Sequence, residues 1–304
     1  MNNIKTGRPR LLVIGCGDVG MRLLPLVRDR FRVFALTSRP ERRAELRAAG
    51  AIPVVADLDR PGTLKRLKGL ARYIVHLAPP QADGMLDRRT RNVTAILPEG
   101  AVVVYISTTG VYGDCMGARI DETRPPAPHN ARAWRRVDAE RTLRQAVLAR
   151  HGRLAILRAP GIYARERLPL ERLEEGTPAL APADDVYTNH IHADDLARIA
   201  ALALFRGLPG RVYNAVDDTE MKMGEYFDAV ADAFGLARPP RLSRAELAAQ
   251  STPLRLSFMS ESRRIGNGRL RTELGVRLRY RTVQAALAAF REDGCRPDDG
   301  RDPS

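Results

Sequence analysis

Short apolar runs alternate with amphipathic stretches through the first half of the chain. The runs are RLLVIG, FRVFALTS, AIPVVAD, RYIVHLA, AVVVYIS and RLAILRA, and they are nearly continuous and rich in β-branched residues. Such runs are typical of parallel strands that are buried on both faces. The stretches at residues 19–30, 41–49 and 131–150 are long enough to form helical crossover connections. The pattern therefore predicts an α/β fold with a doubly wound parallel sheet.

The alternation becomes less regular after Pro160, where proline and glycine are more frequent. Residues 193–205 and 223–234 have helical periodicity, and residues 211–216 have the pattern of a further strand. The last segment, EDGCRPDDGRDPS from Glu292, is polar, which predicts a disordered tail. We therefore expect a smaller, mixed region after the sheet, followed by that tail.

A glycine-rich loop follows the first apolar run. In LLVIGCGDVGMRLL, Gly15, Gly17 and Gly20 have the spacing G-x-G-x-x-G, with Asp18 and Val19 inside the motif, between a predicted strand and a predicted helix. Gly15 permits a tight turn, Gly17 lets the backbone approach a pyrophosphate, and Gly20 lets the helix pack closely on the strand. The N-terminus of the helix then presents free N–H groups to the phosphates. These features predict a Rossmann-type dinucleotide-binding domain.

The end of the second predicted strand indicates which dinucleotide binds. An NAD site usually has Asp or Glu here to bind the ribose 2′-hydroxyl. This chain has Thr37, Ser38 and Arg39 instead, with Arg42 and Arg43 one helical turn further. A carboxylate would repel a 2′-phosphate, whereas a hydroxyl and a guanidinium can bind it. We therefore expect NADP rather than NAD, the alternative being that these arginines are simply exposed charges at the start of a helix.

The formal charge of +14 at pH 7 raises the question of nucleic-acid binding. The arginines are spread along the whole chain with Asp or Glu in each neighbourhood, whereas a nucleic-acid site gathers its cations in one patch. We therefore expect no nucleic-acid partner. Part of the charge can instead attract an anionic ligand, such as a phosphorylated cofactor.

Membrane segments, disulfides and metal sites find little support in the sequence. No apolar run approaches the roughly 20 residues of a membrane-spanning helix, and residues 1–10 contain no apolar segment. Cys16, Cys115 and Cys295 are far apart and lack C-x-x-C spacing, so neither a disulfide framework nor a zinc site is predicted. We expect a cytoplasmic protein with no membrane partner and no metal.

Several later segments resemble motifs of the short-chain dehydrogenase/reductase superfamily, in the extended and atypical branches that include nucleotide-sugar epimerases and dehydratases. YISTTGVYGD is similar to the S-[ST]-x-x-V-Y-G signature after the fifth strand, LRAPGIY resembles the R-P-x-x-x-Y element, and NHIHADDLA resembles the V-H-V-D-D-x-A segment. The resemblance covers nearly the whole chain. The cofactor-lining residues that it implies are Asp57 and Leu58 near the adenine, Leu77, Ala78 and Pro79 near the nicotinamide half, and Ala159 and Pro160 after the sixth strand.

The resemblance also implies a catalytic Ser or Thr, a Tyr and a Lys, of which only the first is present. Thr108 stands at the Ser/Thr position, which would hold the substrate oxygen. Alignment of DAERTL with the family's A-E-x-x-L places Arg132 where Tyr belongs and Arg136 where Lys belongs. Arginine stays protonated at ordinary pH, so Arg132 cannot pass the proton that hydride transfer to a carbonyl requires. Arg136 can still hold the ribose or stabilise an oxyanion as a fixed charge.

Two tyrosines are candidates for the missing acid. Tyr112 lies in the V-Y-G element, where its usual role in the family is structural or substrate-lining. Tyr163 follows the sixth strand and could reach the cleft. The sequence does not choose between them.

A cluster of histidines and aspartates follows at residues 190–195. His190 and His192 beside Asp194 could suggest a metal site. The family's H-x-D-D segment, however, orients loops and begins a helix with Asp194 near its N-terminus, and this interpretation is the stronger one. Trp134, close to Arg132, is expected to be packed rather than catalytic.

Three functions are compatible with these patterns. The first is an NADP(H)-dependent oxidoreductase or epimerase on a small or nucleotide-linked substrate, with Thr108, Arg136 and Tyr112 as candidate catalytic residues. The second is a non-catalytic NADP(H)-binding regulator, and the third, a nucleic-acid binder, depends on charge alone. A sugar 4,6-dehydratase is disfavoured because Thr109 and Gly110 stand where that signature has Asp and Glu.

The expected domain organisation follows from the same patterns. Residues 1–160 form an NADP-binding domain, residues 161–291 form mainly a substrate-binding region, and residues 292–304 form the tail. The chain can cross back to the sheet near residues 186–216. Substrate specificity is expected in the loops at residues 165–186 and 251–268. Helices of such sheets often pair between subunits, so a homodimer is a further expectation.

Overall fold

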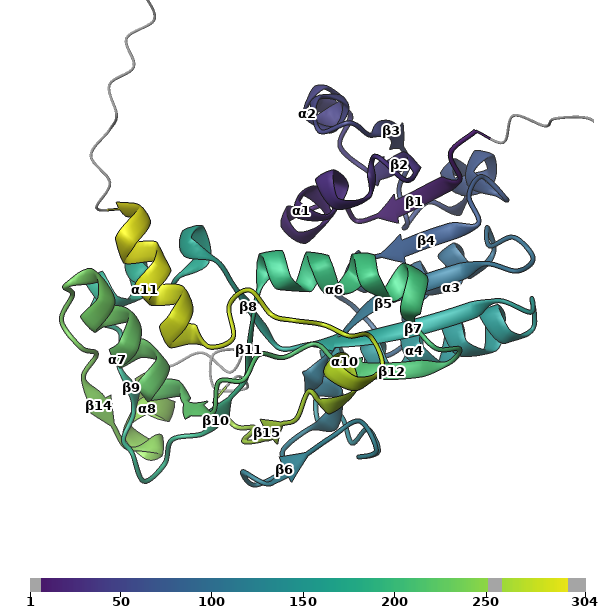
Figure 1. The fold of residues 1–304 in the computed structure, drawn as a ribbon. Helices are drawn as coiled ribbons and strands as arrows, with labels where there is room; N and C mark the ends of the chain where they lie inside the picture. Colours follow the sequence, from purple (N-terminus) through teal and green to yellow (C-terminus); the bar gives the residue numbers. More distant parts are fainter. Residues whose placement is uncertain (1–6, 251–258, 295–304) are drawn as a thin grey trace, which may run out of the picture.

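A seven-stranded parallel sheet forms the centre of the molecule (Figure 1). The computed structural model describes residues 7–250 and 259–294. The strand order is β12-β7-β5-β4-β1-β2-β3, which confirms the predicted α/β fold with a doubly wound sheet. The strands are β1 Arg10–Ile14, β2 Arg32–Thr37, β3 Ile52–Val55, β4 Tyr73–His76, β5 Val102–Thr108, β7 Arg153–Ala159 and β12 Arg211–Asn214.

Helices cover both faces of this sheet. Helices α1 (Asp18–Val27) and α6 (Ala193–Arg206) pack together on one face, and α3 (Arg88–Thr94) and α4 (Ala131–Leu148) pack together on the other. Side chains of successive strand residues point to opposite faces. In β1, Leu11 and Val13 accordingly join the core beneath α1 and α6, while Leu12 and Ile14 join the core on the other side.

The edge strand of the sheet comes from late in the sequence. β12 pairs in parallel with β7, and α6 immediately precedes it in the chain. Shorter elements complete this part of the molecule: η1 Pro40–Arg42, α2 Arg43–Ala48, η2 Pro61–Leu67, η3 Thr109–Tyr112, β6 Arg119–Ile120, β15 Arg264–Ile265 and α10 Gly268–Thr272. The chain therefore returns to the central sheet after the region that follows Pro160.

A second group of helices lies at one end of the molecule, away from β1, β2 and β3 (Figure 1). Its core joins apolar side chains of α5, α7 and α11. Its elements are β8 Gly161–Tyr163, η4 Arg165–Arg167, α5 Leu170–Glu174, β9 Ala179–Leu180, β10 Tyr187–Thr188, β11 His190–His192, β13 Met221–Lys222, α7 Met223–Phe234, β14 Arg241–Leu242, α8 Arg244–Gln250 and α11 Val283–Gly294.

Two local expectations need correction. Helix α11 extends to Gly294, so Glu292 is helical and does not begin the tail; residues 295–304, with Cys295, lie outside the described residues. Trp134 is 41% exposed rather than packed, because α4 buries the face that carries Ala133, Val137 and Leu143. Among the residues that the structure describes, no helix is both long enough and apolar enough to cross a membrane.

Candidate functional site

A cleft of about 690 Å³ opens at the carboxyl ends of the parallel strands, where doubly wound sheets bind ligands. We call it the cofactor cleft. The residues that were predicted to contact a cofactor line it, although they come from five different strand ends. They are Gly15, Gly17, Asp18, Val19, Gly20, Ser38, Arg39, Asp57, Leu58, Leu77, Ala78, Pro79, Ala159 and Pro160.

The three glycines of the loop meet different surroundings. Gly15 has a φ of +82°, and a Cβ there would lie 2.5 Å from the backbone nitrogen of Ala78, so only glycine fits this turn. A Cβ on Gly17 would have no atom within 4 Å, which leaves open space above the start of α1. α1 also begins without a side-chain cap. Its first N–H groups therefore suit the phosphates of a dinucleotide.

The carboxylate of Asp18 in this loop is neutralised by arginines from two elements. The Nε of Arg22 donates to Asp18 at 2.7 Å and Nη1 of Arg167 donates at 2.9 Å. Although burial acts to raise it, these hydrogen bonds lower the pKa of Asp18 below its usual value. Arg22 also pairs with Glu166 and Asp194. The glycine loop is thereby tied to η4 and α6, a connection that the sequence analysis missed.

Arg39 is an uncommitted cation at the end of β2. Ser38 and Arg39 are exposed and line the cofactor cleft. The Oγ1 of Thr37 accepts from the backbone N–H of Arg39 at 3.1 Å, which fixes the turn. Within residues 7–250 and 259–294, the guanidinium of Arg39 has no hydrogen-bond or ion-pair partner. It is therefore available to an anion.

The two following arginines have different surroundings. Arg42 lines the cleft, donates to the carbonyl oxygen of Cys16 at 2.6 Å, and pairs with Glu45 at 2.7 Å. It therefore supports the glycine loop rather than remaining free for a ligand. Arg43 is exposed and does not line the cleft. Of the arginines named for this strand end, Arg39 is the one that lines the cleft without a side-chain partner among the described residues.

A further arginine borders the cleft near Asp57 and Leu58. Arg89 of α3 pairs with Asp59 at 2.5 Å and donates to the carbonyl oxygen of Pro79 at 3.2 Å. It bridges the ends of β3 and β4, on either side of the cleft. No recognisable motif contains Arg89, so the sequence analysis could not identify it.

Thr108 lies where three cavities meet. It ends β5 and lines the cofactor cleft, a cavity of about 320 Å³ that also contains Tyr187 and Glu261, and a pocket of about 530 Å³. Its Oγ1 accepts from the backbone N–H of Gly110 at 3.2 Å, which fixes the side chain. Thr108 is therefore the residue through which the cofactor cleft adjoins both smaller cavities.

Helix α4 brings Arg132 and Arg136 to the same place. Both arginines line the 530 Å³ pocket with Thr108, and Arg136 also lines the cofactor cleft. The structure thus brings together the three positions that the alignment assigned to catalysis. Glu140 of this helix is buried and accepts hydrogen bonds from Ser107 at 2.6 Å and from Arg158 at 2.7 Å. These bonds hold the helix against β5 and β7.

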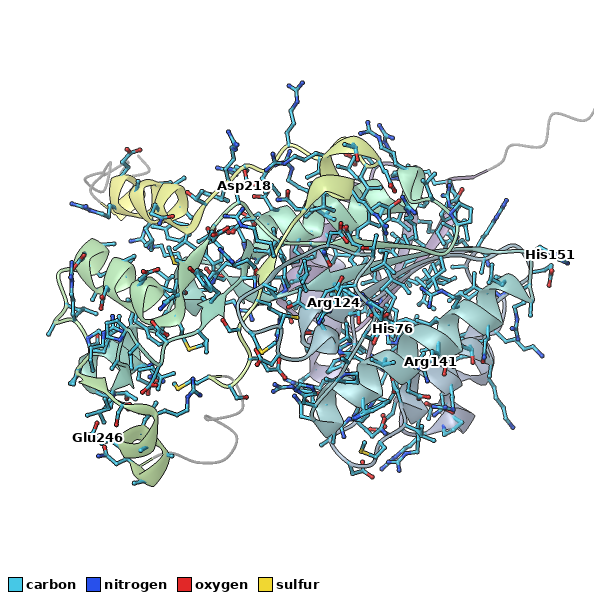
Figure 2. The ribbon with its side chains drawn as sticks, turned by 90° about the horizontal axis from the view of Figure 1, so that it is seen from below. His76, Arg124, Arg141, His151, Asp218 and Glu246 are labelled. Carbon is cyan, nitrogen blue, oxygen red and sulfur yellow. The ribbon has the colours of Figure 1, made fainter. Side chains whose placement is uncertain are left out.

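Arg136 is held in position by the end of the sheet. Its Nη1 donates to the hydroxyl of Tyr105 and to the carbonyl oxygen of Ile106, both at 3.0 Å. Burial raises the pKa of Tyr105 to about 12, so this phenol stays protonated. Burial likewise lowers the pKa of the neighbouring His76 to about 3 (Figure 2). Both groups are therefore neutral at ordinary pH, and the Tyr105 hydroxyl holds Arg136 without titrating.

The two tyrosines that the sequence offered as candidate acids lie away from the cleft. Tyr112 is fully buried and donates to Oδ1 of Asn214 at 2.7 Å. Tyr163 is 2% exposed and packs edge-on against His192. Neither residue lines the cavities around Thr108. The V-Y-G and sixth-strand motifs predicted their position in the chain, but not that their side chains turn into the core.

Tyr187 and Glu261 line the 320 Å³ cavity beside Thr108 and can each carry a proton. The guanidinium of Arg264 lies over the Tyr187 ring at 4.8 Å, and Arg263 pairs with Glu261 at 2.6 Å. The sequence analysis missed both, since they lie far from Thr108 in the chain and in no catalytic motif. Part of the expected specificity loop, residues 251–258, lies outside the described residues.

The histidine and aspartate cluster has a structural role at the start of α6. The Nδ1 of His192 accepts from the backbone N–H of Asp194 at 3.1 Å and so caps the helix. Asp195 is buried and accepts from the backbone N–H groups of Arg279 and Tyr280. In the part of the chain that the structure describes, no three His, Cys, Asp or Glu side chains gather as metal ligands.

The chain is similar to several proteins of known structure. No family model and no curated protein matches the sequence. A conserved protein of unknown function from Silicibacter pomeroyi is 30% identical over 94% of this chain and 99% of its own, with a TM-score of 0.77. A proposed NAD-dependent epimerase/dehydratase from Methylobacillus flagellatus is 27% identical, with 94% and 100% covered and a TM-score of 0.68.

A more distant structure has a known activity. The dTDP-glucose 4,6-dehydratase from Bacillus anthracis, in complex with NAD, is 13% identical, with 94% and 97% covered and a TM-score of 0.72. At this identity the likeness concerns the fold. The chain therefore belongs to the same family as the Silicibacter pomeroyi protein and has the fold of the NAD-dependent epimerases and dehydratases.

Proposed function

We propose that the protein binds NADP(H) and acts as an oxidoreductase or epimerase on a small or nucleotide-linked substrate. The observation that carries the proposal is the convergence of the glycine loop, Arg39 and Thr108 on one cleft. The NAD complex of the Bacillus anthracis enzyme, which has the same fold, supports a nicotinamide cofactor. A volume of about 690 Å³ is within the usual range for ligand sites.

NADP is favoured over NAD by the charge at the end of β2. Arg39 can bind a 2′-phosphate through charge-assisted hydrogen bonds, and Ser38 can donate one more. The chain has no Asp or Glu at residues 37–39 to bind a free 2′-hydroxyl. Bound NADP(H) would supply the hydride donor or acceptor of the reaction.

The residues around Thr108 would bind the substrate oxygen, stabilise its charge and supply the proton. The Thr108 hydroxyl can hold the reacting oxygen of the substrate, and Arg136 can stabilise negative charge on that oxygen. If Arg132 occupies the position of the family's tyrosine, the proton must come from another group. Tyr187, whose ring lines a cavity with Thr108 and Arg132, is the candidate that we propose.

Turnover by the purified protein tests this function. NADPH oxidation and NADP reduction are followed with a panel of carbonyl compounds, alcohols and nucleotide sugars. Turnover by the wild type that falls about 100-fold in Thr108→Ala, with unchanged NADPH affinity, would support the proposal. Turnover that is unchanged in Thr108→Ala would contradict the role of this cleft.

The alternative is a non-catalytic regulator that signals cofactor occupancy. It is favoured by the burial of Tyr112 and Tyr163 away from the cleft. If no panel member reacts, Gly17→Trp abolishes a cellular phenotype, and Thr108→Ala leaves that phenotype intact, the regulator is the better explanation. The open space above Gly17 makes this substitution a direct block of the cleft.

A further inference from the structure

The 530 Å³ pocket beside Thr108 has an unusual lining. It contains three guanidinium groups, those of Arg132, Arg135 and Arg136, and no carboxylate. Its other polar residues are Gln81, Asn130 and Thr108. We call it the arginine pocket. It adjoins the cofactor cleft through Thr108 and Arg136, which line both.

The arginines come from the first turns of α4, which begins at Ala131. Arg135 and Arg136 follow Arg132 by three and four positions, so all three side chains leave the helix on one side. Like charges at this spacing destabilise a helix by a few tenths of a kcal/mol per pair, roughly 0.2–0.5. Partial burial lowers the pKa of Arg132, and Arg135 and Arg136 act in the same direction, against the opposing effect of Glu261. Positive charge is therefore concentrated at this point.

Arg135 and Arg136 have neutral partners, unlike many other arginines of the chain. Nη1 of Arg135 donates to the carbonyl oxygen of Gly84 at 2.6 Å. Arg136 donates to the hydroxyl of Tyr105 and the carbonyl oxygen of Ile106. Neither forms an ion pair within residues 7–250 and 259–294. Elsewhere, Arg91 pairs with Asp138 of the same helix α4.

Burial makes this arrangement costly without an anion. Arg135 is 7% exposed, and its Nε is buried with no hydrogen-bond partner in the described part of the chain. A buried cation is favourable only when an opposite charge and further hydrogen bonds compensate its lost hydration. The lining supplies several donors and no such charge.

We propose that the arginine pocket binds an oxyanion group of the substrate, a carboxylate or a phosphate, next to the atom that Thr108 holds. This inference rests on the proposed function for the position of the reacting atom. Planar guanidinium groups bind both kinds of oxyanion with paired hydrogen bonds. The substrates are then acids or phosphate esters that carry their charge close to the reacting carbon, and the arginines orient them.

The test uses the full chain saturated with NADPH, so that the site at Arg39 is filled. Oxalate and inorganic phosphate are titrated separately by calorimetry at constant ionic strength. We expect about one equivalent of at least one probe to bind. Arg132→Gln and Arg135→Gln should each weaken that binding about tenfold, the loss expected for one charge-assisted hydrogen bond. The probe that binds more tightly indicates whether the pocket takes a carboxylate or a phosphate.

Arg141→Gln is the matched control, because Arg141 is an exposed arginine further along the same helix and lines none of these cavities (Figure 2). It should change the affinity by less than about twofold, as expected for a surface charge. Binding of neither probe, or equal binding by the wild type and Arg132→Gln, would overturn the inference. Arg132 is exposed, so this variant tests the pocket even if Arg135→Gln does not fold.

Failure of the proposed function gives a different result. NADPH binding is measured first by the fluorescence of the cofactor. If NADPH does not bind, this result contradicts the proposed function but not the arginine pocket. The two probes are then titrated into cofactor-free protein, with Arg39→Gln as a second control for phosphate that binds at the cofactor cleft. Loss of probe binding in Arg132→Gln and not in Arg39→Gln would still support the arginine pocket.

Discussion

At the scale of single residues, the proposed preference for NADP over NAD depends on the charge at the end of β2. Arg39 is exposed in the cofactor cleft and its guanidinium is uncommitted among the described residues, whereas Arg42 is bound to Glu45 and to the glycine loop. One side chain therefore carries most of the expected preference for a 2′-phosphate. Its neighbours support the loop or lie outside the cleft.

Arg39→Glu should weaken NADPH binding about tenfold or more, and NADH binding much less, because the new carboxylate repels the 2′-phosphate. Fluorescence titration with both cofactors measures the two dissociation constants. Arg43→Glu makes the same charge change outside the cleft and should affect neither cofactor strongly. If Arg39→Glu weakens the binding of NADPH and NADH equally, this explanation is contradicted.

A buried carboxyl group should make stability depend on pH. Asp217 is 4% exposed, its Oδ2 has no partner among the described residues, and burial raises its pKa from 3.8 to about 7. Between these pH values the Asp217 carboxyl group ionises in the unfolded chain but stays protonated in the folded chain. The free energy of unfolding therefore falls as the pH rises. This difference in pKa corresponds to about 4 kcal/mol at most.

Asp217→Asn should remove this loss, so the free energy of unfolding should fall less between about pH 4 and about pH 7 than in the wild type. Urea unfolding at both pH values measures it. Asp218, which pairs with Arg271 and Arg281, provides the contrast (Figure 2). Its pKa is lowered despite burial, so Asp218→Asn should cost stability at neutral pH. An unchanged pH dependence in Asp217→Asn would contradict the assignment.

At the scale of elements, η4 completes the cofactor cleft from outside the first 160 residues. Arg167 of η4 lines the cleft and neutralises Asp18 at the start of α1. Asp18 would otherwise place a negative charge where the diphosphate of a dinucleotide is expected. The cation from a distant loop therefore compensates an unfavourable residue within the glycine motif.

Arg167→Gln should weaken NADPH and NADH binding by a similar factor of about two to five, because its effect acts through the diphosphate that both cofactors share. The thermal stability of the cofactor-free protein should change little, since this ion pair is about 40% exposed. Arg165→Gln, in the same turn but outside the cleft, is the control. An effect on NADPH alone would contradict this role.

At the scale of the whole molecule, the proposed reaction site is shared between distant parts of the chain. Thr108 comes from the end of β5, Arg132 and Arg136 from α4, and Tyr187 from the later part of the sequence. A bound substrate would therefore contact both the sheet and the smaller group of helices. Chemistry at Thr108 depends on how these parts pack together.

Tyr187→Phe should lower turnover about 100-fold, because it removes the proposed proton donor, and should leave the NADPH dissociation constant unchanged. Tyr73→Phe, on β4 and outside the cavities around Thr108, is the matched control. The comparison is made on a substrate that the wild type converts. Full activity of Tyr187→Phe would exclude this residue as the acid.

Much of the fold could be predicted because its signals are local. The apolar runs matched the strands β1 to β5, β7 and β12, and the helices α4, α6 and α7 began at the predicted residues. The cofactor-lining residues were predictable because each follows a strand of a parallel sheet, and those ends meet at one edge. The sequence left Tyr112 and Tyr163 open as candidate acids because position in the chain does not tell which way a side chain turns; both are buried.

The sequence by itself determined the alternation of strands and helices, the glycine loop and the lack of Asp or Glu at residues 37–39. These features are encoded within a few consecutive residues, so periodicity and side-chain chemistry reveal them. Only the tertiary structure decided which charges are compensated: Arg167 neutralises Asp18, whereas Arg135 is buried with neutral partners. Such balances depend on contacts between residues far apart in the chain, and on burial, which no short segment specifies.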